Sequence, residues 1–67
     1  MEFKLTSEYI ELDNLLKVLD LVASGPEAKA MIKGRNVEVN GQIEERVRRK
    51  LKAGDRVVVA GKEVDIV

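Results

Sequence analysis

Five consecutive residues in the second half of the chain, Arg46-Val47-Arg48-Arg49-Lys50, carry four positive charges. A guanidinium group presents a planar fork of N–H donors and an ammonium group is a mobile point charge, so both residue types suit phosphate oxygens. The same run would also suit a solvated loop on the surface of a charge-rich protein. These residue types therefore indicate either an anion-binding surface or a solvated loop.

The charges of the chain are separated along the sequence, although its formal net charge is zero. Residues 1–27 have a net charge of −4, residues 28–54 a net charge of +5, and residues 55–67 a net charge of −1. The middle segment adds Lys29, Lys33 and Arg35 to the basic run. Such an asymmetry indicates an anionic partner more strongly than the overall isoelectric point does.

The length and composition of the chain exclude several classes of protein. Its 67 residues are enough for one small domain, which buries only roughly 60% of its unfolded surface. The chain contains neither cysteine nor histidine, so disulfides, the usual zinc sites and the usual Ser-His or Cys-His nucleophiles are not expected. No apolar stretch approaches the roughly 20 residues of a membrane span, and the acidic N-terminus does not resemble a signal peptide. We therefore expect a soluble, cytoplasmic protein.

Two helices are expected in the first half of the chain. From Ile10 the apolar residues recur at a helical spacing, which predicts an amphipathic helix of about three turns. The apolar stripe consists of Leu12, Leu15, Leu16 and Leu19. Ser24-Gly25-Pro26-Glu27 predicts the start of the second helix, because serine and a glutamate three residues later form a capping box. Ser24 is therefore interpreted as a helix cap and not as a nucleophile, and Gly34 is expected to end this helix in a left-handed conformation.

Strands are expected at the N-terminus and in the second half of the chain. Residues 2–5 form a short strand. Asn40-Gly41 after Val37-Glu38-Val39 is a strong hairpin signal, because a type I′ turn needs positive φ at both central residues. Residues 56–60 form a valine-rich strand, and a turn at Gly61-Lys62 leads into an alternating strand. The expected fold class is α+β, a single domain over residues 1–67 with a short N-terminal strand, two helices and a small antiparallel sheet of hairpins.

This order of features resembles the ribosomal-protein S-four-type RNA-binding domain, also called the αL motif. The matching residues are Leu12-Asp13, Ser24, Ala28-Lys29, Val37-x-Val39-Asn40-Gly41 and Leu51-x-x-Gly54-Asp55. Ser24-Gly25-x-x-Ala28-Lys29 with Arg46-x-x-Arg49-Lys50-Leu51 resembles more narrowly the free-standing bacterial members, which are ribosome-associated or RNA-binding proteins. Two residues depart from the family pattern. Gly25 stands where larger members commonly have arginine, and Gly34 falls one position before the usual helix-ending glycine.

The resemblance implies that the second helix and the following loop and hairpin form a basic surface that binds structured RNA. The implied RNA-binding residues are Lys29, Lys33, Arg35, Arg46, Arg48, Arg49 and Lys50, with Lys17 and Lys52 as weaker candidates. Each is expected to be exposed, so that its replacement would barely change stability. With one phenylalanine and one tyrosine, the chain has few aromatic rings for base stacking. Binding is therefore expected to read phosphates and shape.

The expected partner is ribosomal or transfer RNA, and with it the ribosome or its subunits, bound by a monomer. No membrane, small-molecule substrate, cofactor or metal is expected. A protein-interaction module that docks an acidic partner, such as a ribosomal protein or an RNA-modifying enzyme, is the alternative. A β-grasp carrier is disfavoured because the chain ends in Asp65-Ile66-Val67 and not in Gly-Gly. An enzyme is disfavoured because no carboxylate pair lies in a recognisable pocket motif and no Gly-rich phosphate loop is present.

Overall fold

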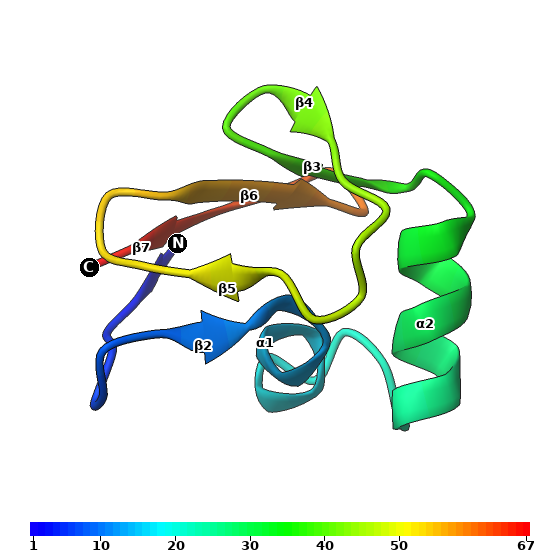
Figure 1. The fold of residues 1–67 in the computed structure, drawn as a ribbon, viewed down its shortest axis with the longest axis horizontal. Helices are drawn as coiled ribbons and strands as arrows, with labels where there is room; N and C mark the ends of the chain where they lie inside the picture. The colour runs from blue at the N-terminus through cyan, green and yellow to red at the C-terminus, as the bar shows by residue number, and fades with distance from the viewer.

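A five-stranded sheet with the order β1-β7-β6-β3-β4 is the largest element of the computed structural model, which describes residues 1–67 (Figure 1). Its strands are β1 (Glu2–Phe3), β3 (Val37–Val39), β4 (Gln42–Ile43), β6 (Arg56–Val59) and β7 (Lys62–Ile66). β1 runs parallel to β7, and the other neighbours are antiparallel. The two expected hairpins, β3–β4 and β6–β7, are confirmed, but the second turn lies at Ala60-Gly61, both with positive φ, and not at Gly61-Lys62.

A second sheet of two short strands was not expected from the sequence. It pairs β2 (Ile10–Glu11) with β5 (Lys50–Leu51) in antiparallel register, Ile10 opposite Leu51 and Glu11 opposite Lys50. Two residues are too few to show an alternating pattern, so this pairing has no local signal. It fixes the end of the basic run to the segment that leads into the first helix (Figure 1).

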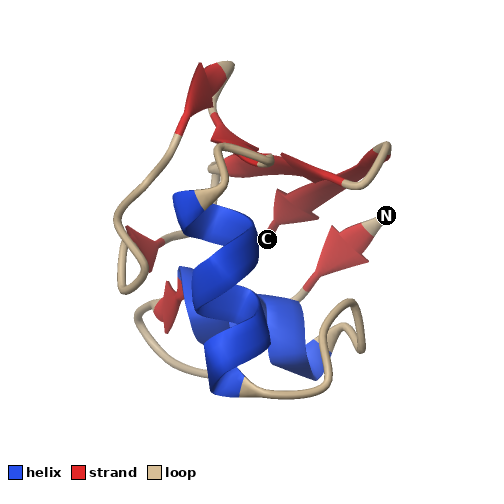
Figure 2. Ribbon diagram, turned by 90° about the vertical axis from the view of Figure 1, so that its right-hand side faces the viewer, coloured by secondary structure: helices blue, strands red, loops and turns tan.

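Both helices lie on the same side of the five-stranded sheet, as Figure 2 shows. They are α1 (Leu12–Val18) and α2 (Gly25–Lys33). Leu12, Leu15 and Leu16 are fully buried, as the apolar stripe predicts, in one core cluster of 13 residues. The expected three turns from Ile10 are wrong, because Ile10 belongs to β2 and Asp20 has a φ of +60°, which stops the helix. The α+β fold class is confirmed. None of the helices is long and apolar enough to cross a membrane.

The start of α2 follows the sequence prediction. Ser24 has extended backbone angles, and its Oγ accepts a hydrogen bond from the Glu27 N–H at 3.4 Å. Pro26 lies in the first turn, where its missing N–H leaves no helical bond unmade. The reciprocal bond from the Glu27 side chain to the Ser24 N–H is absent, so half of the capping box is formed. Ser24 is the helix cap.

The end of α2 differs from the prediction by one residue. Gly34 has a φ of −77°, and the left-handed residue is Arg35, with a φ of +63°. The Arg35 N–H donates to the Ile32 carbonyl at 3.1 Å, and the Asn36 N–H donates to the Met31 carbonyl at 3.3 Å. These two bonds are those of a Schellman motif, whose left-handed position favours glycine. Arg35 therefore stands at the position where this motif most often has glycine.

The two turns in the matched family motifs are tied to each other by side chains. Asn40 begins the β3–β4 turn with a φ of +53°, followed by Gly41 at +84°. The Asn40 Nδ2 donates to Asp55 Oδ1 at 3.0 Å, and Asn40 Oδ1 accepts from the Arg56 N–H at 2.9 Å. Asp55 Oδ2 also accepts from the Lys52 N–H at 2.8 Å. Burial raises the pKa of Asp55, but these hydrogen bonds outweigh that effect and hold its pKa below the usual value.

Replacing Arg35 with glycine should stabilise the protein, because glycine adopts the left-handed region without a Cβ clash. We expect the free energy of unfolding to rise by about 0.5–1 kcal/mol in urea titrations. Gly34→Ala should lower it, since a Cβ there would lie 2.8 Å from Asn36 Nδ2 and 3.0 Å from the Ala30 carbonyl oxygen. A loss of stability in Arg35→Gly would contradict the strain assigned to Arg35.

Candidate nucleic-acid interface

The basic run is held against the N-terminus of α1 by backbone hydrogen bonds. The Leu12 N–H donates to the Arg49 carbonyl at 2.8 Å, and the Asp13 N–H donates to the Val47 carbonyl at 3.1 Å. The N-cap residue Glu11 makes no side-chain capping bond. The first N–H groups of a helix have no partner within it, so these two carbonyls supply the partners that a cap would give. The arrangement caps α1 and fixes the backbone of the basic run at the same time.

A buried carboxylate, Glu44, holds two arginines of the run. Only 8% of its side chain is exposed. Arg46 donates from Nε and Nη2 to the two carboxylate oxygens, each at 2.9 Å, and its backbone N–H donates at 2.9 Å. Arg49 donates from Nη1 at 2.7 Å. The Arg46 hydrogen bonds, against the opposing effect of burial and with the help of Arg49, lower the pKa of Glu44 from 4.5 to about 2.

The expectation that every cation of the run is exposed is therefore wrong for Arg49. The Arg49 side chain is 28% exposed and is bonded to Glu44. Arg46 is 72% exposed, but its guanidinium forms a two-pronged ion pair with the same carboxylate. Removing either side chain would leave a buried charge with fewer partners, which costs stability. The sequence does not indicate these ion pairs, because Glu44 is one of 12 acidic residues and only the fold buries it.

Two neighbouring grooves on the surface are lined by cations. The first lies where α1, α2 and the basic run meet, and its charged lining residues are Asp13, Lys17, Lys29, Lys33 and Arg48. The second has no hydrophobic lining residue and is lined by Arg46, Arg48, Arg49, Lys50 and Lys52. Arg48 lines both. We call these the helix groove and the loop groove.

Arg48 differs from the other arginines of the chain. Arg35, Arg46, Arg49 and Arg56 each form an ion pair with a carboxylate, whereas exposed Arg48 forms none. Its backbone neighbours Val47 and Arg49 are the two residues whose carbonyls accept from α1. The Arg48 guanidinium is thus carried on a fixed backbone, at the junction of the two grooves, with all of its donors free of carboxylate.

The structure brings together six of the seven residues proposed from the sequence. They are Lys29, Lys33, Arg46, Arg48, Arg49 and Lys50. Arg35 lines neither groove and lies at the end of α2, with Nη1 3.9 Å from Glu45 Oε2. Lys17 and Lys52, the weaker candidates, both line a groove. Lys17 was underrated because only the packing of α1 beside α2 brings it to the same groove as Lys29.

The interface contains no built metal centre. No group of three or more His, Cys, Asp or Glu side chains lies close enough together to hold a metal ion. Asp13 is the one acid lining the helix groove, and its Oδ1 is buried without a hydrogen-bond partner. The cations that line the two grooves can donate hydrogen bonds to an anion.

Comparison with known proteins identifies the family. The sequence model of the S4 domain matches residues 3–67, and the chain belongs to the S4 domain family. It is 41% identical over 59 residues to the Escherichia coli (strain K12) protein named "Putative RNA-binding protein YbcJ", covering 88% of this chain and 84% of that protein. A YbcJ of Shigella flexneri, named as an uncharacterized protein, matches with the same identity and coverage.

The fold comparison agrees with the sequence comparison. The solution structure of Escherichia coli YbcJ matches with a TM-score of 0.72 and 39% identity, over 98% of this chain and 85% of that one. That structure is described as showing an αL motif involved in RNA-binding. The resemblance to the αL motif and to its free-standing bacterial members is confirmed.

Glu44 should make the stability of the protein depend on acid pH. Its pKa is 4.5 in the unfolded chain and about 2 in the folded one, so its contribution is complete above about pH 5 and is lost as pH falls towards about 2. Glu44→Gln should cost about 1–3 kcal/mol at neutral pH. The difference in unfolding free energy between wild type and this variant should shrink through that window.

The matched control is the neighbouring Glu45→Gln, because Glu45 is exposed and its contact with Arg35 is long. Urea titrations of the three proteins across the acid range make the comparison. A Glu44→Gln deficit that stays constant down to about pH 2 would contradict the assigned role of the Glu44 carboxylate.

Proposed function

We propose that this protein binds structured RNA without catalysing a reaction, and that the helix groove and the loop groove receive the phosphates. The observation that carries the proposal is Arg48, an exposed arginine without a carboxylate partner, on a fixed backbone where two cation-lined grooves join. A phosphate backbone presents anions at regular intervals, so two adjoining cationic grooves suit consecutive phosphates. The description of Escherichia coli YbcJ as having an RNA-binding motif supports the same function.

Unpaired cations in the two grooves give this neutral protein a local positive field. Six of the groove cations form no ion pair: Lys17, Lys29, Lys33, Arg48, Lys50 and Lys52. Elsewhere on the surface, Arg56 is neutralised by Glu63 at 2.8 Å and by Asp65 at 3.2 Å. Such a surface attracts an anionic partner to one side of the molecule although the net charge is zero.

Arg46 and Arg49 have two roles in this proposal. Each guanidinium has five N–H donors, and the bonds to Glu44 use two from Arg46 and one from Arg49. The remaining donors are available to phosphate, while Glu44 fixes the direction in which they point. Arg35 lies at the margin of the surface and contributes to the general field. Phosphate contacts of this kind position an RNA but carry little sequence information.

The family resemblance favours ribosomal or transfer RNA, on the ribosome or its subunits, as the partner of a monomer. The cytoplasm is the proposed location because these RNAs are found there. The main competing function is docking of an acidic protein partner to the same grooves, and the experiment below separates the two.

Arg48→Ala should weaken RNA binding several-fold and leave the melting temperature nearly unchanged, because the side chain is exposed and unpaired. Affinity is measured against one hairpin RNA at several salt concentrations. For each lost phosphate contact, the slope of log K against log salt should flatten by roughly 0.7–0.9. Lys62→Ala removes the same charge from an exposed position that lines neither groove, and it should change neither affinity nor slope.

Equal affinities and equal slopes for wild type and Arg48→Ala would refute the phosphate-binding role of the groove junction. A wild-type protein that binds no structured RNA at low salt, but captures an acidic protein through Arg48, would establish the docking function instead.

A further inference from the structure

A single tyrosine stands beside the loop groove. Tyr9 precedes β2, and 39% of it is exposed. The Lys50 Nζ lies 5.0 Å from the centroid of the Tyr9 ring, a cation–π distance. Lys50 itself lines the loop groove. The exposed ring is therefore in direct contact with a cation that we assign to phosphate binding.

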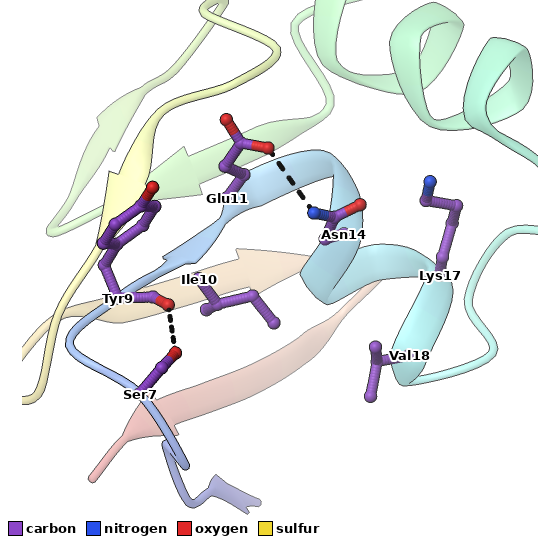
Figure 3. Close-up of a pocket in the computed structure, with 7 residues that line it drawn as sticks. All are labelled: Ser7, Tyr9, Ile10, Glu11, Asn14, Lys17 and Val18. Carbon is purple, nitrogen blue, oxygen red and sulfur yellow. Dashed lines mark hydrogen bonds between the residues drawn. The ribbon is translucent and has the colours of Figure 1, made fainter.

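A separate pocket lies beside Tyr9, between the β2 segment and α1 (Figure 3). Tyr9, Ile10 and Val18 give it apolar walls. Ser7, Glu11, Asn14 and Lys17 give it polar groups. Lys50 does not line this pocket, but it contacts Tyr9, which does. We call it the tyrosine pocket.

One cation from each groove lies next to the tyrosine pocket. Lys17 lines this pocket and also the helix groove. Lys50 lies over the ring that forms the opposite wall. An RNA strand whose phosphates contact these two lysines would place the nucleotide between them at the pocket. The pocket thus adjoins the helix groove through Lys17 and the loop groove through the contact of Tyr9 with Lys50.

The lining chemistry suits a nucleobase and not a phosphate. Glu11 presents a carboxylate at the pocket, which repels phosphate, while the tyrosine ring and the two aliphatic side chains offer a stacking surface. Asn14 Nδ2 donates to Glu11 Oε1 at 3.5 Å, the outer limit of a hydrogen bond, so this contact is easily exchanged for a ligand. Both side chains are half-buried on regular elements and are therefore held in place.

A carboxylate has two acceptor oxygens and therefore favours a base with two adjacent N–H donors. The Watson–Crick edge of guanine offers two adjacent N–H groups, which a carboxylate can accept together, and beside them a carbonyl oxygen. Asn14 Nδ2 and the Lys17 ammonium are donors of the same pocket that suit this oxygen. The other three bases present a single N–H site on that edge. Unpaired bases are the usual targets of such recognition in RNA.

We propose that the tyrosine pocket receives one unpaired guanine of the bound RNA, stacked on Tyr9 and hydrogen-bonded to Glu11. This inference rests on the proposed function and adds to it a specificity that phosphate contacts lack. It also revises the expectation that a chain with few aromatic rings reads phosphates and shape with little base specificity.

The test uses hairpin RNAs with one constant stem and a single unpaired position occupied by guanine, adenine or an abasic residue. Wild type should bind the guanine hairpin roughly 5- to 150-fold more tightly than the abasic one, the range expected for one stacked base. Tyr9→Ala should remove this preference and Tyr9→Phe should keep it. Glu11→Gln should reduce the preference for guanine over adenine.

Intrinsic fluorescence gives a second readout. Tyr9 is the only tyrosine and the chain has no tryptophan, so its emission reports this position alone. The guanine hairpin should quench the emission, whereas an abasic hairpin of matched absorbance should not. Equal quenching by both hairpins would overturn the stacking assignment.

The abasic hairpin separates this inference from the proposed function. Wild type should still bind it in a salt-dependent manner, because the phosphate contacts of the two grooves do not require the base. Equal wild-type affinity for all three hairpins would overturn the guanine pocket and leave the phosphate-binding function standing. Absence of salt-dependent binding to any hairpin would overturn the proposed function itself.

Discussion

The repulsion among like charges is the constraint around which this small domain is arranged. Residues 46–52 contain five cations, which would repel one another and splay apart in an unsupported loop. The buried Glu44 carboxylate offsets this repulsion, because it accepts hydrogen bonds from Arg46 and Arg49. The N-terminal N–H groups of α1 add two bonds to the backbone of the run. Once these are satisfied, Arg48 remains directed at solvent without a carboxylate partner.

The residues that mark the S4 domain hold the two ends of this charged segment. Upstream, Asn40 and Gly41 form the turn between β3 and β4, from which the chain enters the run. Downstream, β5 pairs with β2, and Asp55 then bonds to Asn40. The Asn40–Asp55 hydrogen bond thus brings the two ends of the intervening segment together at one corner of the sheet. The family motif therefore fixes both ends of the segment that contains the basic run. A binding surface that is fixed in advance loses less conformational entropy when a partner binds.

The sequence predicts well those features that local chemistry decides. The leucine stripe of α1, the Ser24 cap and the Asn40-Gly41 turn depend on residues a few positions apart, and the structure confirms them. The pairing of β2 with β5 and the burial of Glu44 depend on residues brought together by the whole fold. The surface positions of Lys17 and Tyr9 also depend on the whole fold. The sequence therefore gives Lys17 only as a weak candidate and does not place Tyr9 at a pocket. The left-handed conformation was assigned to Gly34 because glycine adopts it most easily, whereas the structure has it at the next residue, Arg35.

NMR titration of the ¹⁵N-labelled chain with a hairpin RNA measures directly where RNA contacts the protein. As RNA is added, we expect the amide resonances of the two grooves, namely those of Lys17, Lys29, Lys33 and residues 46–52, to shift together. The resonances around Arg56, Glu63 and Asp65 should stay in place. Shifts confined to the face that carries Arg56, Glu63 and Asp65, with residues 46–52 unperturbed, would contradict RNA binding by the two grooves.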